Sequence, residues 1–337
     1  MRTSSSHPRP LPWILSLLFL VLGCGGGGDQ PEIWIYTSVY KEIYPLYEPG
    51  LTEAFPGVDF RFYQSGSEKI AAKILAEEKG GGTQADILLT SDLFFYQELK
   101  ERGKLLSFTG DHEASVAEAL KDPDETFVVN RYPLMVLAYN REAITGDDIP
   151  RGFQDLLDPR HAGRLTMPSP LESGSAMTSA LYLHERFGEE YFEGLRANDV
   201  LSAGGNGSTL SRIQSGERPV GMVLLENVLK AQASGLEGVE WVVPEEGALV
   251  IPSPVAVLAD SDQPDLARQV ADWLFSEAAR EVVVKGWMYS VIPEDPAPQG
   301  APPYDEIQLH PWDLQTFISW SSKRQEVKTR FREIVLQ

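Results

Sequence analysis

Residues 58–90 read VDFRFYQSGSEKIAAKILAEEKGGGTQADILLT, and this stretch contains the pattern that decides the fold. The β-branched and aromatic residues at 58–63 predict a strand, and apolar residues between 67 and 78 recur at helical spacing. Residues 85–90 predict a second strand. A strand, a helix and a strand in this order are typical of a parallel sheet covered by helices.

The same alternation continues on both sides of this stretch. Further strands are expected at 32–37, 164–169, 200–203 and 219–227, and further helices at 42–55, 92–103, 175–187, 208–216 and 264–286. Two β-rich runs, 126–140 and 238–259, are expected to carry the chain out of a first lobe and back into it. We therefore expect an α/β protein in which 32–130 and 256–337 form lobe 1 and 131–255 form lobe 2. The proline-rich composition of 293–304 predicts a loop.

Ser65 stands where a predicted strand meets a predicted helix, and it allows two interpretations. Glu68 follows three residues later, so the pair matches a capping box that only starts the helix. Alternatively, a helix start beside a glycine presents backbone N–H groups and a positive dipole end to an anion. The motif by itself favours the cap.

Small hydroxyl residues and glycines recur at five junctions between predicted strands and helices. In an open parallel sheet these junctions gather at the carboxyl edge, where ligands bind. Residues from both lobes are therefore expected to converge on one small polar or anionic ligand. The candidate ligand-binding residues are Thr37, Ser38, Gly66, Ser67, Ser91, Gly174, Ser175, Ser208 and Thr209. Ser175 and Ser208 are the favoured ligand contacts, because neither is followed three residues later by the Glu or Gln of a capping box.

The first residues predict export. Two arginines precede an apolar run at 13–22, which is about half the length of about 20 residues needed to span a bilayer, so residues 1–23 predict a signal peptide. Cys24 is the only cysteine and follows Val21-Leu22-Gly23, a sequence that resembles a bacterial lipobox. We expect lipidation of Cys24 and a flexible glycine-rich tether over 24–31 that holds the protein at a bacterial membrane, in the periplasm or at the cell surface. An ordinary signal peptide with an incidental cysteine is the alternative.

Composition excludes several classes of protein. The net charge is −20 and no basic cluster stands out, which argues against nucleic-acid binding. The five histidines show no paired metal spacing, and we expect neither a metal site nor a cofactor. Ser38-Val39-Tyr40-Lys41 matches S-x-x-K, but the K-T-G and S-D-N partners of that motif are missing, so a serine acyl-transfer enzyme is not expected.

Residues 33–92, PLMVLAYN at 133–140, the Ser173–Ser175 region and SRIQSGERPVG at 211–221 resemble the solute-binding proteins of bacterial ABC importers. The resemblance is to the branch that holds ferric-ion, phosphonate and sugar-phosphate binders, and it covers most of the chain. It implies a two-lobed periplasmic-binding-protein fold, type II-like, with two parallel-rich sheets joined by hinge crossover strands. It also implies a monomer that carries a small solute to an ABC permease and its ATPase.

The expected cargo is a small anionic solute such as a phosphorylated sugar or a phosphonate. Ferric-ion binders of this branch carry adjacent tyrosines after the strand that corresponds to 219–227, whereas this chain has Glu226-Asn227 there and no Tyr-Tyr pair anywhere. Glu226 and Asn227 are therefore further candidate ligand residues, suited to hydroxyl or amine groups. A ferric-ion site built without a tyrosine pair is the alternative. Tyr40, Tyr44 and Tyr47 share one helical face and are expected mainly to pack.

Overall fold

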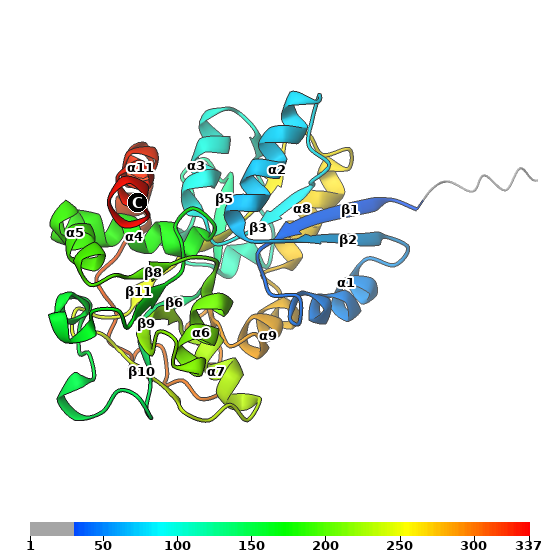
Figure 1. Ribbon diagram of the computed structural model, residues 1–337. Helices are drawn as coiled ribbons and strands as arrows, with labels where there is room; N and C mark the ends of the chain where they lie inside the picture. The colour runs from blue at the N-terminus through cyan, green and yellow to red at the C-terminus, as the bar shows by residue number, and fades with distance from the viewer. Residues whose placement is uncertain (1–29) are drawn as a thin grey trace, which may run out of the picture. The chain divides into compact units, whose positions relative to one another are not determined.

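The computed structural model describes residues 30–337, which form two β-sheets with helices on their faces (Figure 1). The first sheet has the strand order β13-β5-β12-β3-β1-β2, with β4 paired to β12. Its strands are β1 (Glu32–Thr37), β2 (Asp59–Gln64), β3 (Ile87–Leu89), β4 (Leu105–Leu106), β5 (Phe127–Tyr132), β12 (Ser253–Leu258) and β13 (Tyr289–Ser290). β1 pairs in parallel with β2 and β3, whereas β12 runs antiparallel to β3 and β5.

The second sheet has the order β10-β6-β9-β7-β8, with β11 paired to β6. Its strands are β6 (Leu134–Asn140), β7 (Leu165–Met167), β8 (Leu201–Ser202), β9 (Val220–Leu224), β10 (Val239–Val242) and β11 (Leu249–Val250). β7 is parallel to β8 and β9, and β6 is antiparallel to β9 and β10. The predicted α/β architecture with two sheets is confirmed.

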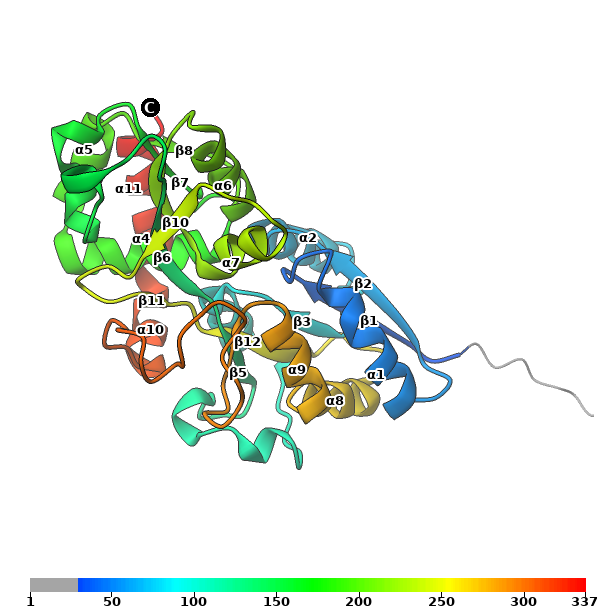
Figure 2. The same cartoon turned by 90° about the horizontal axis from the view of Figure 1, so that it is seen from below.

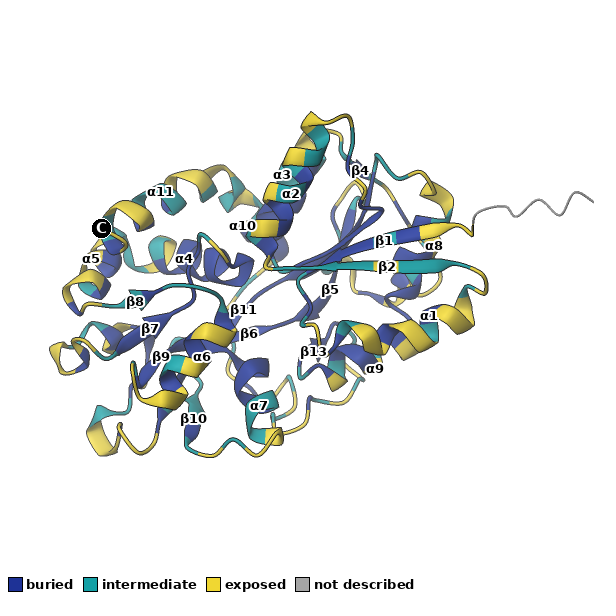
Figure 3. Ribbon diagram, turned by 45° about the vertical axis from the view of Figure 1, so that its right-hand side comes forward, coloured by how far each residue is buried: buried dark blue, intermediate teal, exposed yellow. Residues whose placement is uncertain are grey.

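The helices divide between the sheets. Around the first sheet lie α1 (Glu48–Ala54), α2 (Ser67–Lys79), α3 (Leu93–Glu101), α8 (Pro264–Trp273) and α9 (Glu277–Lys285). Around the second lie α4 (Gly174–Phe187), α5 (Glu189–Ala197), α6 (Asn206–Ser215) and α7 (Leu225–Ala233). Figure 3 shows most strands of both sheets buried between helices whose outer faces are exposed, whereas the edge strand β2 is only partly buried. The burial of apolar side chains on both faces of each sheet thus creates a core in each lobe.

The chain crosses between the sheets where the two β-rich runs were predicted. β5 and β6 lie in different sheets, although only Pro133 separates them. β11 and β12 also lie in different sheets, with only Ile251 and Pro252 between them. Proline has no N–H to donate to a ladder, so a proline at each crossing suits the change of sheet.

Several element boundaries differ from the predictions: for example, the helix expected at 42–55 is a 3-10 turn over Tyr44–Tyr47 followed by α1, and α6 begins at Asn206 rather than at 208. The strand expected at 219–227 ends at Leu224, so Glu226 and Asn227 lie in the first turn of α7. The single helix expected at 264–286 is two helices, because the Ser276 side chain accepts a hydrogen bond from the Ala279 amide and caps a new helix start.

The C-terminal segment contacts both lobes. α10 (Leu314–Ser319) packs against α3 beside the first sheet, whereas α11 (Arg324–Val335) packs against α4 and α5 beside the second (Figure 2). Val327, Phe331 and Val335 recur at intervals of four residues and are buried there. The sequence pattern did not indicate this third crossing, and the predicted lobe boundaries stay a prediction.

Within residues 30–337, no helix is long and apolar enough to span a membrane. The predicted signal peptide, Cys24 and most of the tether lie outside the described residues.

Candidate functional site

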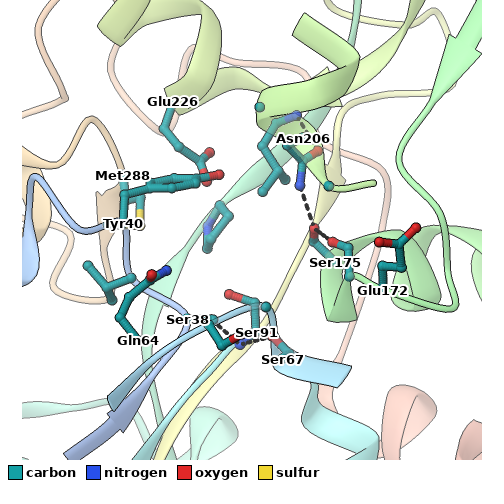
Figure 4. Close-up of a pocket in the computed structure, with 18 of the residues that line it drawn as sticks. Ser38, Tyr40, Gln64, Ser67, Ser91, Glu172, Ser175, Asn206, Glu226 and Met288 are labelled. Atoms are coloured by element: carbon teal, nitrogen blue, oxygen red, sulfur yellow. Dashed lines mark hydrogen bonds between the residues drawn. The ribbon is translucent and has the colours of Figure 1, made fainter. Parts of the chain in front are cut away.

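A cavity of about 230 Å³ lies between the two sheets. Its walls follow the carboxyl ends of the parallel strands β1, β2 and β3 of the first sheet and β7, β8 and β9 of the second. It is lined by Ser38, Val39, Tyr40, Gln64, Ser65, Gly66, Ser67, Lys69, Ser91, Arg131, Pro133, Glu172, Ser173, Ser175, Gly205, Asn206, Gly207, Leu224, Glu226 and Met288. Figure 4 shows Ser38, Ser67 and Ser91 together on one side and Ser175 and Asn206 on the other.

On the side of the first sheet, three serines share one hydrogen-bond cluster. The Ser91 amide lies within hydrogen-bond distance of Ser38 Oγ (3.2 Å) and Ser67 Oγ (3.4 Å) and donates to both. The Ser253 hydroxyl donates to Ser91 Oγ at 2.9 Å. Because Ser38 and Ser67 already accept a hydrogen bond, their O–H groups are left to donate into the cavity.

On the side of the second sheet, Asn206 Nδ2 donates to Ser175 Oγ at 3.0 Å. The Ser173 and Ser175 hydroxyl oxygens are also 3.0 Å apart, and Ser173 accepts the Ala176 amide as the cap of α4. Ser173 can therefore donate its proton to Ser175, whose own O–H then remains for a ligand. Asn206 Oδ1 accepts the Leu224 amide at 3.2 Å, which orients the amide of the side chain.

Three helices begin at the cavity wall. The N-cap residues of α2, α4 and α6 are Gly66, Ser173 and Gly205, and all three line the cavity. The N-terminal end of a helix carries a partial positive charge and N–H groups without intrahelical partners. The N–H groups at these three helix starts are therefore further hydrogen-bond donors at the cavity wall.

Arg131, near the end of β5, contributes a buried cation. The residue is 1% exposed, and its Nε and Nη1 atoms have no hydrogen-bond partner among the described residues. Burial lowers the pKa of the guanidinium from its ordinary value, and nearby groups, among them Tyr47 and Glu226, oppose this effect. Arginine nevertheless stays protonated in proteins, so the cavity wall holds a positive charge without a protein counterion within the described chain.

Glu226 is the second buried ionisable group of the cavity. It is 3% exposed, and its Oε2 atom has no hydrogen-bond partner within residues 30–337. Burial raises the pKa of Glu226 to about 8, although its backbone hydrogen bond and Arg131 lower it. The carboxyl therefore carries a proton near neutral pH and can donate as well as accept a hydrogen bond.

The two lobes touch beside the cavity. The Tyr40 hydroxyl, which follows β1, donates to Asn227 Oδ1 of α7 at 2.8 Å, and Lys230 Nζ lies 3.2 Å from Glu42 Oε2. A Cβ atom on Gly174 would lie 2.7 Å from the Ser91 carbonyl oxygen, so the glycine allows this close approach.

The structure brings six of the eleven predicted ligand residues to the cavity and places five outside its lining. Those that line it are Ser38, Gly66, Ser67, Ser91, Ser175 and Glu226. The Thr37 hydroxyl donates to the Leu89 carbonyl and the Thr209 hydroxyl to the Gly205 carbonyl, so both bond their own lobe. Ser208 is exposed, Gly174 packs against the other lobe, and Asn227 bonds Tyr40.

The predicted capping box at Ser65 is wrong. The N-cap of α2 is Gly66, and no side chain caps this helix. Glu68 does not reach back to the cap, because its carboxylate pairs with Arg324 and Lys328.

Sequence reasoning missed several lining residues, namely Gln64, Lys69, Arg131, Glu172 and Asn206. A signal existed for Arg131, which is the one charge in the predicted β-rich run at 126–140. A charge within a buried strand is costly and often functional. Asn206 lies in Gly204-Gly205-Asn206-Gly207, a glycine-rich approach to a predicted helix.

Comparison with known proteins identifies the family. Residues 83–315 match the family model of bacterial extracellular solute-binding proteins. A probable ABC transporter periplasmic-binding protein of Sinorhizobium fredii is 24% identical over 239 residues, 64% of this chain and 62% of that protein.

Two solved structures share the fold. Iron-bound HitA from Pseudomonas aeruginosa aligns with a TM-score of 0.79 at 20% identity, over 89% of this chain and 99% of its own. AfuA from Actinobacillus pleuropneumoniae with exogenous fructose-6-phosphate aligns with a TM-score of 0.80 at 22% identity, over 91% and 99% of the two chains. The chain belongs to the family of bacterial extracellular solute-binding proteins, which are binding proteins and not enzymes.

Proposed function

We propose that this protein is the solute receptor of an ABC importer and that it captures a small anionic solute in the cavity between its lobes. The Sinorhizobium fredii relative is named as a probable ABC transporter periplasmic-binding protein, which supports this role. The receptor would act as a monomer in the periplasm or at the cell surface and deliver its solute to a permease and ATPase. The predicted lipid on Cys24 would keep it near the membrane.

The buried guanidinium of Arg131 is the observation that carries the anionic cargo. A buried charge without a counterion is strongly unfavourable, and two nitrogens of Arg131 lack partners within the described chain. A bound phosphate, phosphonate or carboxylate would supply both the opposite charge and the hydrogen-bond acceptors that arginine needs.

The remaining walls suit the same kind of ligand. The Ser38, Ser67 and Ser175 hydroxyls each accept a hydrogen bond from the protein and can donate their own proton to a ligand, and three helices begin at the cavity. A volume of about 230 Å³ is below the range of about 300–1,000 Å³ typical of sites for drug-sized ligands. The cargo is therefore a small molecule.

Glu226 suggests what lies at the other end of the solute. Its protonated carboxyl can exchange hydrogen bonds with hydroxyl groups, and on losing its proton it can bind an amine. A phosphorylated sugar or an aminophosphonate carries an anionic group together with such a partner. Iron is less well supported, because this chain has Glu226-Asn227 where the ferric-ion binders that it resembles carry adjacent tyrosines.

Calorimetry on the purified protein tests this proposal. The panel is fructose 6-phosphate, 2-aminoethylphosphonate, inorganic phosphate, fructose, spermidine and ferric citrate. We expect binding of at least one phosphorylated or phosphonate compound and weaker binding of fructose and spermidine. Binding of ferric ion alone, or of spermidine alone, would overturn the anionic cargo.

Small-angle scattering tests the receptor mechanism. A solute that contacts both lobes binds the closed state more tightly than the open state, so its binding shifts the protein toward the closed state. The radius of gyration should therefore fall when the best ligand of the panel is added at saturation. An unchanged radius with a saturating ligand would contradict closure between the lobes.

A further inference from the structure

Two carboxylates lie directly behind the cavity serines of the first lobe. Glu68 follows Ser67 in the first turn of α2, and Asp92 follows Ser91 as the N-cap of α3. The Glu68 side chain is 9% exposed and that of Asp92 is 1% exposed, so water screens neither well. Both negative charges are placed where they would repel an anion in the cavity.

The C-terminal helix supplies the opposite charges. Arg324 Nη2 lies 2.8 Å from Glu68 Oε1 and 2.6 Å from Asp92 Oδ2, and Lys328 Nζ lies 2.5 Å from Glu68 Oε2. Arg324 and Lys328 are one turn apart in α11, and Arg324 pairs with both acids whereas Lys328 pairs with Glu68 alone. Neither residue lines the cavity.

The cations and the acids belong to different sides of the molecule. α2 and α3 lie beside the first sheet, whereas α11 packs against α4 and α5 beside the second (Figure 2). α11 thus brings positive charge to the first-lobe helix starts that carry Ser67 and Ser91. The neutralising charge therefore comes from the C-terminal segment that crosses between the lobes.

We propose that Arg324 and Lys328 are positioning residues that make the serine side of the first lobe compatible with an anion by neutralising Glu68 and Asp92. This inference rests on the proposed binding of an anionic solute. A buried unit charge acts over several ångströms at low effective dielectric, so its loss is felt at the ligand without a direct contact. On the second-lobe side two acids line the cavity: Glu226, whose raised pKa keeps it protonated near neutral pH, and Glu172, which is exposed and accepts a hydrogen bond from the Gly204 amide.

Charge-removing variants of the full chain test the inference. With fructose 6-phosphate, 2-aminoethylphosphonate and inorganic phosphate as probes, Arg324→Gln should bind the best anion about tenfold more weakly than wild type. Adding Glu68→Gln should restore most of this affinity, because it removes one carboxylate and returns the net charge of the cluster from −1 to zero, with Asp92 and Lys328 remaining. A purely structural role of Arg324 would give no such rescue.

Lys323→Gln is the matched control, because it removes a neighbouring positive charge that pairs with Glu185 of α4 within the second lobe. Its affinity should equal that of wild type. If Arg324→Gln does not unfold cooperatively, Lys328→Gln with and without Glu68→Gln replaces it. If Arg324→Gln binds the anion as tightly as wild type, or if Glu68→Gln does not rescue its weaker binding, this inference is wrong. Neither result would contradict the proposed anionic cargo. The absence of any anion binding by wild type would overturn the proposed cargo as well.

Discussion

Two buried glutamates, one on each side of the cavity, have their charge controlled in different ways. Glu68 of the first lobe is paired with Arg324 and Lys328 from outside the cavity. Burial and Asp92 raise the pKa of Glu68, and the two cations oppose the rise. Glu226 of the second lobe has no cation within 4 Å among the described residues, and burial raises its pKa to about 8.

The difference shows how a strongly acidic protein can provide a site for an anion. Glu68 is neutralised by an ion pair and Glu226 by a proton. At neutral pH neither carboxyl group therefore offsets the buried positive charge of Arg131. The overall charge of −20 acts from outside, where salt screens it, whereas the groups near the cavity act at short range. Local arrangement therefore outweighs net charge.

The largest expected effect comes from Arg131, the buried cation in the cavity between the lobes. Arg131→Ala should weaken binding of the best anion of the panel by at least about thirtyfold, because truncating one member of a buried charge pair costs about 2–5 kcal/mol or more. Arg141→Ala is the control, since this arginine is exposed and pairs with Glu240. Titration calorimetry gives both affinities. Equal losses in the two variants would show that Arg131 is not a ligand contact.

The second prediction concerns the protonated acid. The pKa of Glu226 is about 8 in the folded chain against 4.5 ordinarily, so the folded state holds this proton more tightly. Its contribution to the free energy of unfolding is complete below about pH 4.5 and is lost as the pH rises through 8, on the order of 5 kcal/mol in all.

Urea unfolding of wild type and Glu226→Gln between pH 5 and 9 measures this contribution. The free energy of unfolding of Glu226→Gln should decrease much less with rising pH than that of wild type. Glu68→Gln should flatten the dependence less, because cations oppose the rise in the pKa of Glu68. The same pH dependence in wild type and Glu226→Gln would contradict the comparison of the two acids.

The third prediction separates two serines of the second lobe. Ser175→Ala should weaken anion binding by about 1.5–3 kcal/mol, the value of a hydrogen bond to a charged group. Ser208→Ala should leave affinity unchanged, because this side chain is exposed and does not line the cavity. Calorimetry on both variants decides between them, and a loss in Ser208→Ala equal to that in Ser175→Ala would place the ligand elsewhere.

The smallest effect is expected at the contact between the lobes. A Cβ on Gly174 would lie 2.6 Å from Asp92 Cβ and 2.9 Å from Ser67 Cβ, so Gly174→Ala should hold the lobes apart and weaken binding about fivefold. Gly80→Ala is the control, because Gly80 lies outside the cavity lining and its added Cβ would meet only the Glu77 carbonyl oxygen, at 3.1 Å. Scattering with saturating ligand should show a larger radius of gyration for Gly174→Ala alone.

The sequence contains enough to predict the sheets but not all of the site. Alternating patterns located most strands and helices because they depend on residues close in sequence. The capping box at Ser65 failed for the opposite reason, since the partners of Glu68 lie 256 and 260 residues further on. The outward position of Ser208 also depends on how α6 packs, which spacing alone does not give. Arg131 could have been suspected from its charge, but its lack of partners is visible only in three dimensions.

The crossing strands also determine when during synthesis this protein can fold. β12, residues 253–258, pairs with β3 and β5 and lies between them in the first sheet. The Tyr96 hydroxyl donates to the Pro254 carbonyl, 158 residues later, so the core around α3 is incomplete until that segment emerges. Contacts this distant in sequence slow folding. The chain therefore completes its first lobe only after most of the second has been made.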